Sequence, residues 1–525
     1  MIELSGENLS IEQLVRVARF GEKVSPLGES ARLRMQSSSE WVQRSIHQEG
    51  RVIYGVNTGF GSLATQIIKP EQAQQLSRNL ILLCVCGVGE PLSRELVRAM
   101  MVIRANMLAK GLSGVRPVVA QTLIDMLNAG VTPWVPSKGS LGASGDLAPL
   151  AHIAVVLTRA IDDGQLEYSG QAWYRGELLS GAQAMERAGI QRLVLEAKEG
   201  LALSNGIDFM AAAGALAVFD AERLLQNAQI AAALSLEALL GLSAAFDPTL
   251  HAAAGQPGQI KIATNLRALT KGSQLVDSNP QRVQDAYSLR CIPQVLGPIH
   301  DTLAFLRQRF SIAINAVTDN PLIVPAEAGG ESHRAISGGN FHGQGPAMWL
   351  DFLGIAIAEA ASIAERRIFR LLTPELNEGL PAMLAPYSGL DGGLMMIQYT
   401  AAALVSDNKT LAHPDSVDSI PSCANQEDHV SMGANAARHT LEILENVGRV
   451  LACELMAAAQ AIDLRPDGVG RLGAATARAH AQVRQRVAFM EHDRQTTPDI
   501  EALCEMVRSG ELLQSEEGIL RADPA

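Results

Sequence analysis

The chain has 525 residues, of which 47% are hydrophobic, 19% charged and only 4% aromatic. This composition predicts a folded core of Ala, Leu, Ile and Val in one very large unit or in two to three packed regions, and it excludes disorder over most of the length. With 43 Lys and Arg against 55 Asp and Glu, and with no long basic run, the chain has a formal net charge of −12 and is not expected to bind nucleic acid.

The beginning of the chain and its cysteines point to a cytoplasmic protein without a membrane segment. MIELSGENLSIEQ contains acidic residues and no apolar core, so it does not resemble a signal peptide. The apolar stretch 229–246 is interrupted by Ser235 and Glu237, which favours a buried helix over a membrane span. Six cysteines are scattered without a disulfide framework, and Cys84-x-Cys86 lacks the two-residue gap of zinc or thioredoxin motifs. We therefore expect reduced thiols.

Long helical patterns alternate with short polar blocks rich in glycine and proline. Asp146 is expected to cap a helix over 147–161, with Pro149 in its first turn. The following segment, 162–176, predicts a surface hairpin or meander. Apolar residues at helical spacing predict two further helices over 349–372 and 441–464, each roughly 35 Å long at 1.5 Å per residue.

These elements predict a mainly α fold with a long helical bundle as its core and minor β-hairpin content. Long helices with apolar stripes tend to pack side by side. We expect an N-terminal region over residues 1–200, which carries the loop described next, and a helical-bundle region over residues 201–525. No flexible linker divides the chain, so the two regions are expected to pack as one continuous unit.

The block Gly139–His152 offers chemistry that no ordinary side chain supplies. If the chain bends tightly at Ala143-Ser144-Gly145, the amide nitrogen of Gly145 can attack the carbonyl carbon of Ala143 and close a five-membered ring. Glycine suits this step because it has no Cβ to block the close approach. Loss of water from Ser144 then leaves an exocyclic methylene, which is an electrophile. A helix starting directly after this turn would point its positive end at the ring.

Gly142-Ala-Ser-Gly-Asp-Leu-Ala-Pro-Leu150 resembles the signature of the histidine, phenylalanine and tyrosine ammonia-lyase family. The resemblance covers roughly residues 5–510, because further blocks resemble motifs of this family in the same order. These six blocks are Tyr54–Gly61, Asn205-Gly206, Tyr287–Cys291, Thr318–Pro321, Gly338–His342 and Gln426–His429. The overall likeness is greatest to histidine ammonia-lyases. The resemblance implies elimination of ammonia from an aromatic L-α-amino acid to give the trans-α,β-unsaturated acid.

The resemblance also implies a prosthetic group, 4-methylidene-imidazol-5-one, which forms from Ala143, Ser144 and Gly145. This electrophile is expected to trap the amine and make it a better leaving group. Tyr54 matches the family's loop tyrosine and is the candidate base for the β-proton. Because a phenol has a pKa of about 10, a positive neighbour or a helix end would have to favour its anion.

Arg290 resembles the family arginine that holds the substrate carboxylate. Its planar fork suits a bidentate pair with a carboxylate, and lysine would substitute poorly. Tyr287 lies one helical turn earlier and would share the same face of a helix. By resemblance, Tyr287 and Asn205 contact the electrophile or the polar groups of the substrate.

Three more residues are assigned to the site by resemblance. Phe341 resembles the family phenylalanine beside the ring. Glu427 matches a position that is Glu in the histidine enzymes, where it interacts with the amino group or assists proton transfer, and Gln426 lies beside it. His342 and His429 lack the spacing of metal ligands, so no metal site is expected.

Substrate choice in this family is tied to two adjacent residues upstream of a Gly-x-Gly turn, and here they are Leu83 and Cys84. The usual pairs are Ser-His in histidine enzymes, His-Leu in tyrosine enzymes and Phe-Leu in phenylalanine enzymes. Neither Leu83 nor Cys84 can bind an imidazole or a phenol as histidine would, and with Ser204 they would line an apolar pocket. The pair therefore predicts a carbocyclic or bulkier aromatic substrate. Leu147 and Met395, the latter at a position where phenylalanine enzymes tend to have Lys, complete the expected substrate contacts.

Several alternatives remain open. The 413–421 and 426–432 segments are most like the histidine enzymes and favour conversion of histidine to urocanate instead. A 2,3-aminomutase would use the same prosthetic group. An inactive assembly subunit is disfavoured because Tyr54, Ser144, Tyr287 and Arg290 are all retained, and a fumarase-type lyase lacks its Gly-Ser-Ser-x-Met-Pro loop here. The resemblance further implies a homotetramer in which several subunits build each site.

Overall fold

The computed structural model describes residues 1–161, 168–326 and 332–513 of the chain. These residues form two compact units, and both are discontinuous in sequence. The first unit contains Met1–Leu216, Gln308–Asp351 and Pro414–Arg438, and the second contains Ala217–Arg307, Phe352–His413 and His439–Ala525. The division expected from sequence, into an N-terminal region over residues 1–200 and a helical-bundle region over residues 201–525, stays a prediction.

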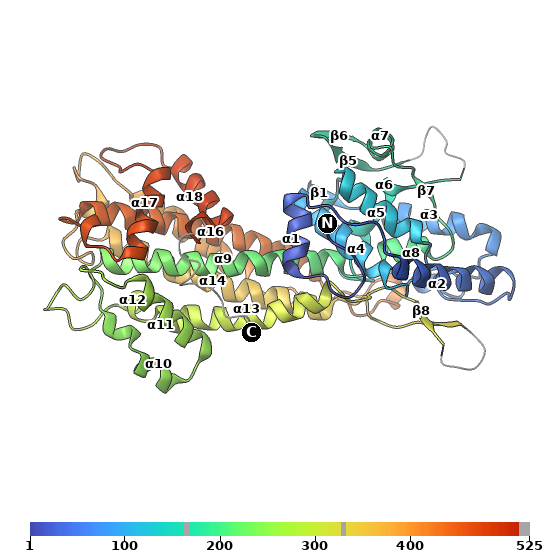
Figure 1. Cartoon of the computed structure of the whole chain (residues 1–525), viewed down its shortest axis with the longest axis horizontal. Helices are drawn as coiled ribbons and strands as arrows, with labels where there is room; N and C mark the ends of the chain where they lie inside the picture. Colours follow the sequence, from blue (N-terminus) through green and yellow to red (C-terminus); the bar gives the residue numbers. More distant parts are fainter. Residues whose placement is uncertain (162–167, 327–331, 514–525) are drawn as a thin grey trace. The chain divides into compact units, whose positions relative to one another are not determined.

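The first unit is built mainly from helices of moderate length with short strands between them (Figure 1). Its helices are α1 (Ile11–Phe20), α2 (Glu29–His47), η1 (Gly61–Leu63), η2 (Pro70–Gln72), α3 (Ala73–Cys84), α4 (Arg94–Ala109), α5 (Pro117–Ala129), α6 (Leu147–Leu157), α7 (Gly181–Arg187), α8 (Glu199–Ser204) and η5 (Cys423–Asn425). Its strands are β1 (Val88–Pro91), β2 (Thr132–Pro133), β3 (Pro136–Lys138), β4 (Thr158–Arg159), β5 (Gln171–Tyr174), β6 (Glu177–Ser180), β7 (Leu193–Val194), β8 (Leu322–Pro325) and β9 (His333–Ile336).

Three helices of the first unit, α3, α6 and α8, contact one another and fix the segments that follow them. Leu80 and Cys84 of α3, Ala151 of α6 and Leu201 of α8 form one buried apolar cluster. Burying such side chains stabilises the folded chain by about 1.5–3 kcal/mol for each large one. This packing sets the positions of the residues at the helix ends, which include Leu147 and Ser204.

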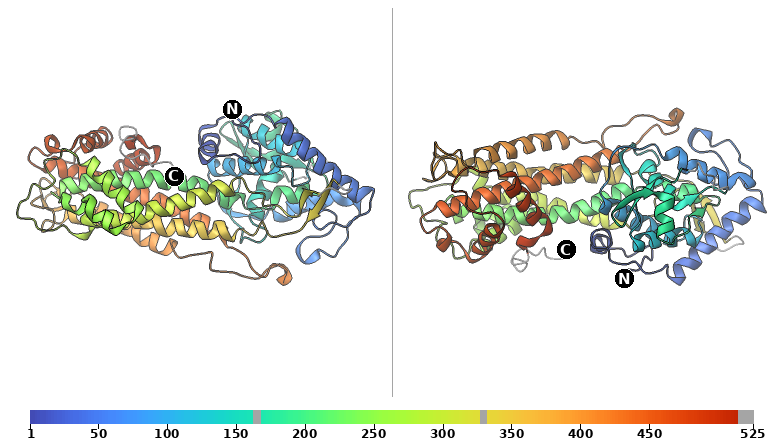
Figure 2. Two further views of the ribbon diagram at one scale, coloured as in Figure 1. Left: turned by 60° about the horizontal axis from the view of Figure 1, so that its bottom comes forward. Right: turned by 90° about the horizontal axis from the view of Figure 1, so that it is seen from above.

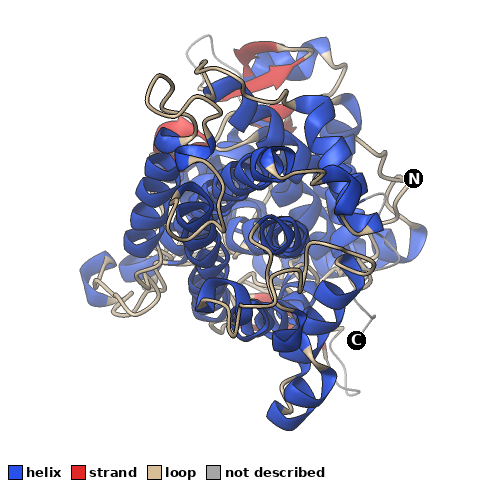
Figure 3. Ribbon diagram, turned by 90° about the vertical axis from the view of Figure 1, so that its left-hand side faces the viewer, coloured by secondary structure: helices blue, strands red, loops and turns tan. Residues whose placement is uncertain are grey.

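Strands make up a small part of the structure, which is mostly helical (Figure 3). β5 and β6 form an antiparallel hairpin that extends to β2, and β8 pairs with β9. The hairpin predicted over 162–176 is confirmed in its second half, since β5 begins at Gln171. Residues 162–167 of that prediction lie outside the described residues.

Four long helices have residues in both units: α9 (Asp208–Ala238), α13 (Ile292–Ala313), α14 (Gln344–Leu372) and α16 (Gly433–Leu464). The helices predicted over 349–372 and 441–464 are confirmed as parts of α14 and α16. The apolar stretch 229–246 lies largely in α9, where the residues from Ile230 to Leu236 are buried, as expected of a core helix. The helix predicted over 147–161 is shorter than expected and ends at Leu157, because Thr158 turns into β4 and pairs with β7.

The second unit is a bundle of long helices with shorter helices around it (Figure 2). A buried ion pair joins Arg367 of α14 to Glu454 of α16, with Nε–Oε1 and Nη2–Oε2 distances of 2.5 and 2.9 Å. Ser235 of α9 donates to the same carboxylate at 2.7 Å, so three helices share one polar contact. The surrounding elements are η3 (Ser243–Phe246), α10 (Pro248–Ala254), α11 (Pro257–Leu269), α12 (Tyr287–Arg290), η4 (Ala382–Leu384), α15 (Met395–Leu411), η6 (Val469–Arg471), α17 (Ala474–Arg486), α18 (Thr497–Ser509) and η7 (Glu511–Leu513).

One helix of the described residues, α14, is long and apolar enough to cross a membrane by length and composition alone. In its most apolar window, 56% is buried inside the structure. The core helix of a soluble protein passes the same test, so this is weak evidence for a membrane span.

Candidate active site

The tripeptide Ala143-Ser144-Gly145 lies in a tight, closed turn. The Gly145 N–H donates to the Gly142 carbonyl at 3.1 Å, and both glycines have positive φ values, 94° for Gly142 and 76° for Gly145. Ser144, which is not glycine, also lies in the left-handed region with a φ of 52°. Such a conformation costs on the order of 1–3 kcal/mol and persists only where the surroundings hold it. The turn therefore presents Ser144 in a strained conformation with Ala143 and Gly145 on either side.

A second segment, which ends α8, holds this turn from one side. The Gly206 N–H donates to the Ser144 carbonyl at 3.2 Å, and the Asp146 N–H donates to the Gly206 carbonyl at 2.7 Å. A Cβ on Gly145 would overlap the Gly206 carbonyl and would lie 2.9 Å from the carbonyl oxygen of Phe341. The structure thus brings Asn205-Gly206 and Phe341 to the turn, and there is no room for a side chain at Gly145.

Asp146 does not cap α6, which is a correction to the expectation from sequence. Its side chain makes no hydrogen bond to the first turn of α6. Instead, Oδ2 accepts from the N–H groups of Phe209 and Met210 at 2.8 and 3.1 Å, which are free donors at the start of α9. The Asp146 side chain binds α9 because the start of this helix lies against the turn and offers two N–H donors at once. Asp146 therefore joins the turn to α9.

A buried ionic network surrounds Asn205 and the start of α9. Arg104 Nε lies 2.7 Å from Asp208 Oδ2, and its Nη1 donates to the carbonyls of Ala202 and Asn205. Lys198 Nζ lies 2.6 Å from Asp319 Oδ2, and Asn205 Nδ2 donates to Asp319 Oδ1 at 3.2 Å. Sequence reasoning missed Arg104, Lys198, Asp208 and Asp319, and only the Thr318–Pro321 motif hinted at one of them.

Burial changes the protonation of two of these carboxyl groups. Burial, with a smaller contribution from the charge of Asp208, raises the pKa of Asp146 to about 8, against the opposing hydrogen bonds from Met210 and Phe209. Burial likewise raises the pKa of Asp208 to about 6, although Arg104 opposes the increase. The side chain of Asp146 is therefore expected to be largely protonated at neutral pH.

Tyr54 lies in a loop that packs against the segment following residue 420. The Tyr54 hydroxyl accepts from the Gly61 N–H at 3.2 Å, which fixes the ring relative to η1. Cys423 Sγ accepts from the Ser62 N–H at 3.3 Å, and a Cβ on Gly61 would overlap this sulfur. Cys423 and its two successors have φ values of 50°, 52° and 68°, so η5 is a strained turn that meets the Tyr54 loop.

Glu427 belongs to the same segment and lies against Gly61 of the Tyr54 loop. Its Oε2 accepts from Ser422 Oγ at 3.0 Å, and a Cβ on Gly61 would lie 3.6 Å from its Oε1. Burial raises the pKa of the Cys84 thiol to about 12, and Cys86 and Glu427 add to the increase. Gln426 beside Glu427 is exposed. Glu427 thus lies next to Gly61, whose N–H binds the Tyr54 hydroxyl, and its charge acts on the Cys84 thiol.

The selectivity pair is divided between the interior and the surface of the unit. Cys84 is 8% exposed and packs with Leu80, Ala151 and Leu201, and the partly buried Leu147 lies against this cluster. Leu83 is 73% exposed. Ser204 is fully buried and donates to the Gly200 carbonyl at 3.0 Å. Within the first unit, Cys84 and Leu147 therefore share one apolar surface, whereas Leu83 and Ser204 do not belong to it.

Three predicted site residues belong to the second unit. Arg290 lies over the Tyr287 ring, with 4.6 Å from Cζ to the ring centroid, as their spacing of one helical turn predicts. Tyr287 is 70% exposed, and Arg290 Nε is buried without a hydrogen-bond partner. Met395 begins α15.

The two histidines considered as metal ligands lie together in the first unit. Their rings stack with centroids 5.2 Å apart, and His429 Nδ1 lies 3.2 Å from His342 Nε2. Among the residues that the structure describes, no three or more His, Cys, Asp or Glu side chains gather in a way that could hold a metal ion. The histidine pair instead joins the segment of Phe341 to the segment of Glu427.

Comparison with known proteins places this site in a family. Residues 9–485 match the family model described as aromatic amino acid lyase. The chain belongs to the aromatic amino acid lyase family. It is 49% identical to a protein named histidine ammonia-lyase from Symbiobacterium thermophilum and 48% identical to one from Alkaliphilus metalliredigens, and 98–99% of each chain is covered. The chain is accordingly a carbon–nitrogen lyase of the ammonia-lyase type, as its motifs predict.

Solved structures of this family share the fold. A histidine ammonia-lyase from Trypanosoma cruzi matches with a TM-score of 0.88 and 35% identity, over 100% of this chain and 98% of the other. A tyrosine aminomutase from Streptomyces globisporus matches with a TM-score of 0.90 and 36% identity over 99% of both chains. These likenesses confirm the predicted mainly helical fold.

The raised pKa of Asp146 predicts how stability changes with pH. The folded chain keeps this proton up to about pH 8, whereas the unfolded chain loses it near the ordinary value of 3.8. The contribution of Asp146 to stability is therefore complete below about pH 4 and is lost as the pH rises through about 8. Asp146→Asn keeps an oxygen acceptor for α9 and removes this titration. Its Tm should fall less than that of the wild type between about pH 5 and about pH 9.

The measurement is thermal unfolding at one fixed protein concentration. Asp125→Asn is the control, because Asp125 is exposed on α5 and outside the network. Tm curves of wild type and Asp146→Asn that run parallel across this range would contradict the assigned pKa.

Proposed function

We propose that the protein is a histidine ammonia-lyase that converts L-histidine to urocanate and ammonia. The observation that supports this most strongly is its similarity to relatives named histidine ammonia-lyase, which are 46–49% identical over 97–100% of the chain. The Gln426-Glu427 pair, which matches the histidine enzymes, agrees with it. This similarity favours histidine over the carbocyclic or bulkier substrate that Leu83 and Cys84 predict. By the same similarity we expect the protein to act in the cytoplasm.

The Gly142–Gly145 turn fits the prosthetic group 4-methylidene-imidazol-5-one. Its hydrogen bond from Gly145 to Gly142 and the left-handed φ of Ser144 bend Ala143 and Gly145 toward each other, as ring closure requires. The space around Gly145 excludes any Cβ, which agrees with its role as the attacking nitrogen. Once formed, the ring would supply an electrophilic methylene for the substrate amine.

The chain's own side chains then have separate tasks. Tyr54 takes the β-proton of the substrate, and the Gly61 N–H that it accepts would stabilise its anion. Arg290 binds the substrate carboxylate through donors that include its unpartnered Nε. Asn205 lies directly before Gly206, which binds the turn, and its side chain is fixed by a hydrogen bond to Asp319. Phe341 packs beside the ring.

Glu427 is the polar residue that is best placed to take over the imidazole contact that histidine provides elsewhere in the family. Burial keeps the Cys84 thiol neutral, so it offers only a weak S–H donor. Glu427 acts on the pKa of this thiol through its charge, accepts from Ser422, and retains a second carboxylate oxygen for a ligand. We assign Glu427 to the substrate ring or amine, with Gln426 beside it.

We further propose a homotetramer in which each active site combines residues of several subunits. Tyr287 is 70% exposed, and Phe352, Ile355 and Phe369 on α14 are 40–44% exposed. These three apolar side chains recur at helical spacing on α14, and an exposed stripe of this kind is typical of a subunit interface. A second copy of the chain would cover this stripe and account for its composition without a membrane.

A 2,3-aminomutase is the second candidate, because the tyrosine aminomutase structures are as similar in fold as the lyase structures. It would return the amine to the β-carbon. The products of the assay below distinguish the two activities.

A panel of L-histidine, L-phenylalanine and L-tyrosine tests the substrate. We expect kcat/KM for L-histidine to exceed the others by about tenfold or more, measured by the ultraviolet absorbance of the conjugated acid. Glu427→Ala should lower kcat/KM for L-histidine by about 10–100-fold, because the proposed contact of its carboxylate with the substrate is removed. A highest kcat/KM for phenylalanine or tyrosine would refute the proposed substrate, and a β-amino acid product would establish the aminomutase.

Intact mass tests the prosthetic group. The wild type should be lighter than its sequence by two water molecules, since one is lost on ring closure and one from Ser144. Ser144→Ala should not lose the water that comes from its hydroxyl, and its activity should fall by several orders of magnitude. An active wild type of full sequence mass would rule out the group.

Mixed subunits test the shared site. Ser144→Ala and Arg290→Met subunits are each expected to be nearly inactive, because one lacks the electrophile and the other the carboxylate contact. If sites combine Ser144 of one subunit with Arg290 of another, co-refolded mixtures should recover a measurable fraction of wild-type activity. Mixtures as inactive as either variant alone would contradict sharing of these two residues.

A further inference from the structure

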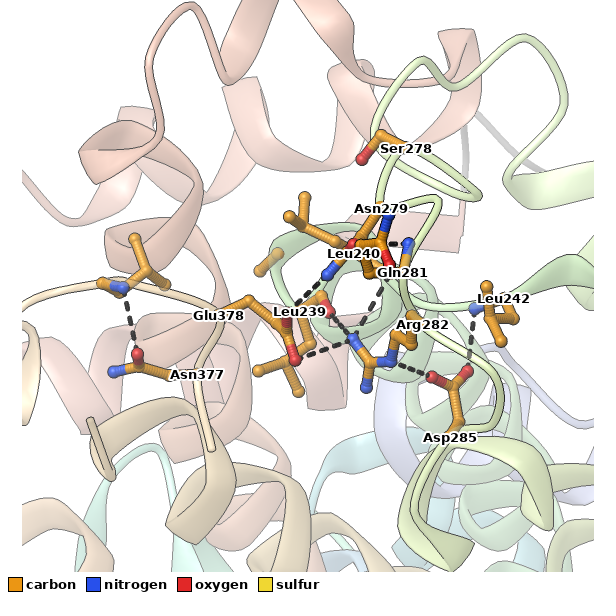
Figure 4. A network of polar contacts seen from close by, with 12 residues as sticks. Leu239, Leu240, Leu242, Ser278, Asn279, Gln281, Arg282, Asp285, Asn377 and Glu378 are labelled. Carbon is orange, nitrogen blue, oxygen red and sulfur yellow. Dashed lines mark hydrogen bonds and ion pairs between the residues drawn. The ribbon is translucent and has the colours of Figure 1, made fainter. Parts of the chain in front are cut away.

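We propose that Arg282 is a positioning residue that holds Arg290 and Tyr287 in place through the segment before α12. The proposal rests on the carboxylate-binding role that is proposed above for Arg290. Figure 4 shows the residues concerned, which we call the Arg282 hub: Arg282, Asp285 and Glu378 with the carbonyls of Leu239 and Leu240. All of them belong to the second unit.

Arg282 contacts two carboxylates and the carbonyls at the end of a helix. Its Nε lies 2.7 Å from Asp285 Oδ1, and its Nη1 lies 3.4 Å from Glu378 Oε1. Nη1 also donates to the carbonyls of Leu239 and Leu240. The side chains of Arg282 and Asp285 are 7% and 1% exposed. A nearly buried guanidinium with this many partners is restricted to one position.

The carbonyls that Arg282 binds belong to the end of α9. The last carbonyls of a helix lack partners inside the helix and carry a partial negative charge, so an arginine is favoured there. Arg465 binds the same end, since its Nε and Nη2 donate to the Ala238 carbonyl at 2.9 and 2.7 Å, while Nη1 donates to the Glu378 carbonyl at 2.6 Å. Two arginines thus connect the end of a long core helix to Glu378, and Arg282 alone extends the connection to Asp285.

Backbone strain is concentrated around the hub. Leu240, Asp277 and Glu378 have φ values of 51°, 59° and 59°, although none is glycine. Each such conformation costs on the order of 1–3 kcal/mol and persists only where the surroundings determine it. Asp277 accepts from both the N–H and the hydroxyl of Ser243, at 2.9 and 2.6 Å. The conformation of this region therefore depends on its polar contacts and not on local preference.

α12 has only four residues, so it cannot hold its own position. A helix this short is unstable alone, because one turn of hydrogen bonds does not offset the cost of ordering it. Asp285 lies two residues before its first residue, Tyr287, and Asp285 Oδ2 accepts from the Leu242 N–H at 2.8 Å. On the other side, the Ser288 carbonyl accepts from Arg367 at 3.4 Å. Arg282 therefore fixes the segment that enters α12, while α13 fixes the segment that leaves it after Cys291, and Tyr287 and Arg290 lie between these two supports.

The test compares ligands with and without a carboxylate in Arg282→Lys. Lysine keeps the charge but cannot bind Asp285, Glu378 and the α9 carbonyls together. We expect kcat/KM to fall about tenfold or more for the amino acid that the wild type prefers, because small displacements of a positioning group have effects of this size. The inhibition constant of the matching amine without the carboxylate should change less than about twofold. The probe pairs are L-histidine with histamine and L-phenylalanine with phenethylamine.

Arg98→Lys is the matched control. Arg98 in the first unit also binds helix-end carbonyls, those of Val17 and Ala18 at 2.8 and 3.1 Å. The Arg98→Lys variant should leave both kcat/KM for the amino acid and the inhibition constant of the amine in the same proportion as in the wild type, whatever its effect on Tm. Glu378→Gln is the second variant, which removes one charged partner of Arg282 and keeps an amide for Asn279, and it should shift the ratio in the same direction.

The outcomes separate this proposal from the one it rests on. An equal loss of affinity for amino acid and amine in both Arg282→Lys and Glu378→Gln would mean that the hub only supports the fold, and the proposal would be overturned. Arg290→Lys serves as the benchmark. If Arg290→Lys itself shows no carboxylate-specific loss, the proposed role of Arg290 fails, irrespective of the result for Arg282.

Discussion

The Asp146 carboxyl group connects the reactive turn to the start of the long helix α9, and the rest of the candidate site depends on this contact. Asp146 follows Gly145 directly and binds two N–H groups at the start of α9. Its own N–H binds Gly206, which in turn binds Ser144. These hydrogen bonds hold Ser144 in its strained left-handed conformation, which this segment would not adopt without them.

Polar side chains bind the free backbone groups at both ends of α9. Asp146 accepts from its first N–H groups, and two arginines donate to its last carbonyls, where the helix dipole favours a positive charge. At each end, the contact also fixes a short segment that carries candidate site residues: Ala143–Gly145 in the first unit and Tyr287–Arg290 in the second. In both cases a rigid helix determines the conformation of a segment that has little stability of its own.

The sequence predicts elements whose signal is local and misses contacts between distant residues. The helices over 349–372 and 441–464 follow from apolar spacing, and the tripeptide and Phe341 are found by their motifs. Asp146 was predicted to cap α6 because a local pattern shows only the helix that follows it, whereas the helix that it binds begins 62 residues later. Lys198 and Asp319 are separated by 121 residues, and Arg282 binds carbonyls, which have no sequence signature. Such pairs become visible only when the chain is folded.

The division of the selectivity pair changes how Leu83 and Cys84 bear on the substrate. If both side chains lined the pocket, they would replace a polar wall with an apolar one, and histidine would be a poor ligand. Of the two, only Cys84 is buried with the apolar cluster, and Glu427 helps to keep its thiol neutral by raising the pKa. If Glu427 contacts the substrate ring, as proposed above, an imidazole N–H would satisfy its carboxylate, whereas a phenyl ring would leave the carboxylate without a partner, which costs free energy.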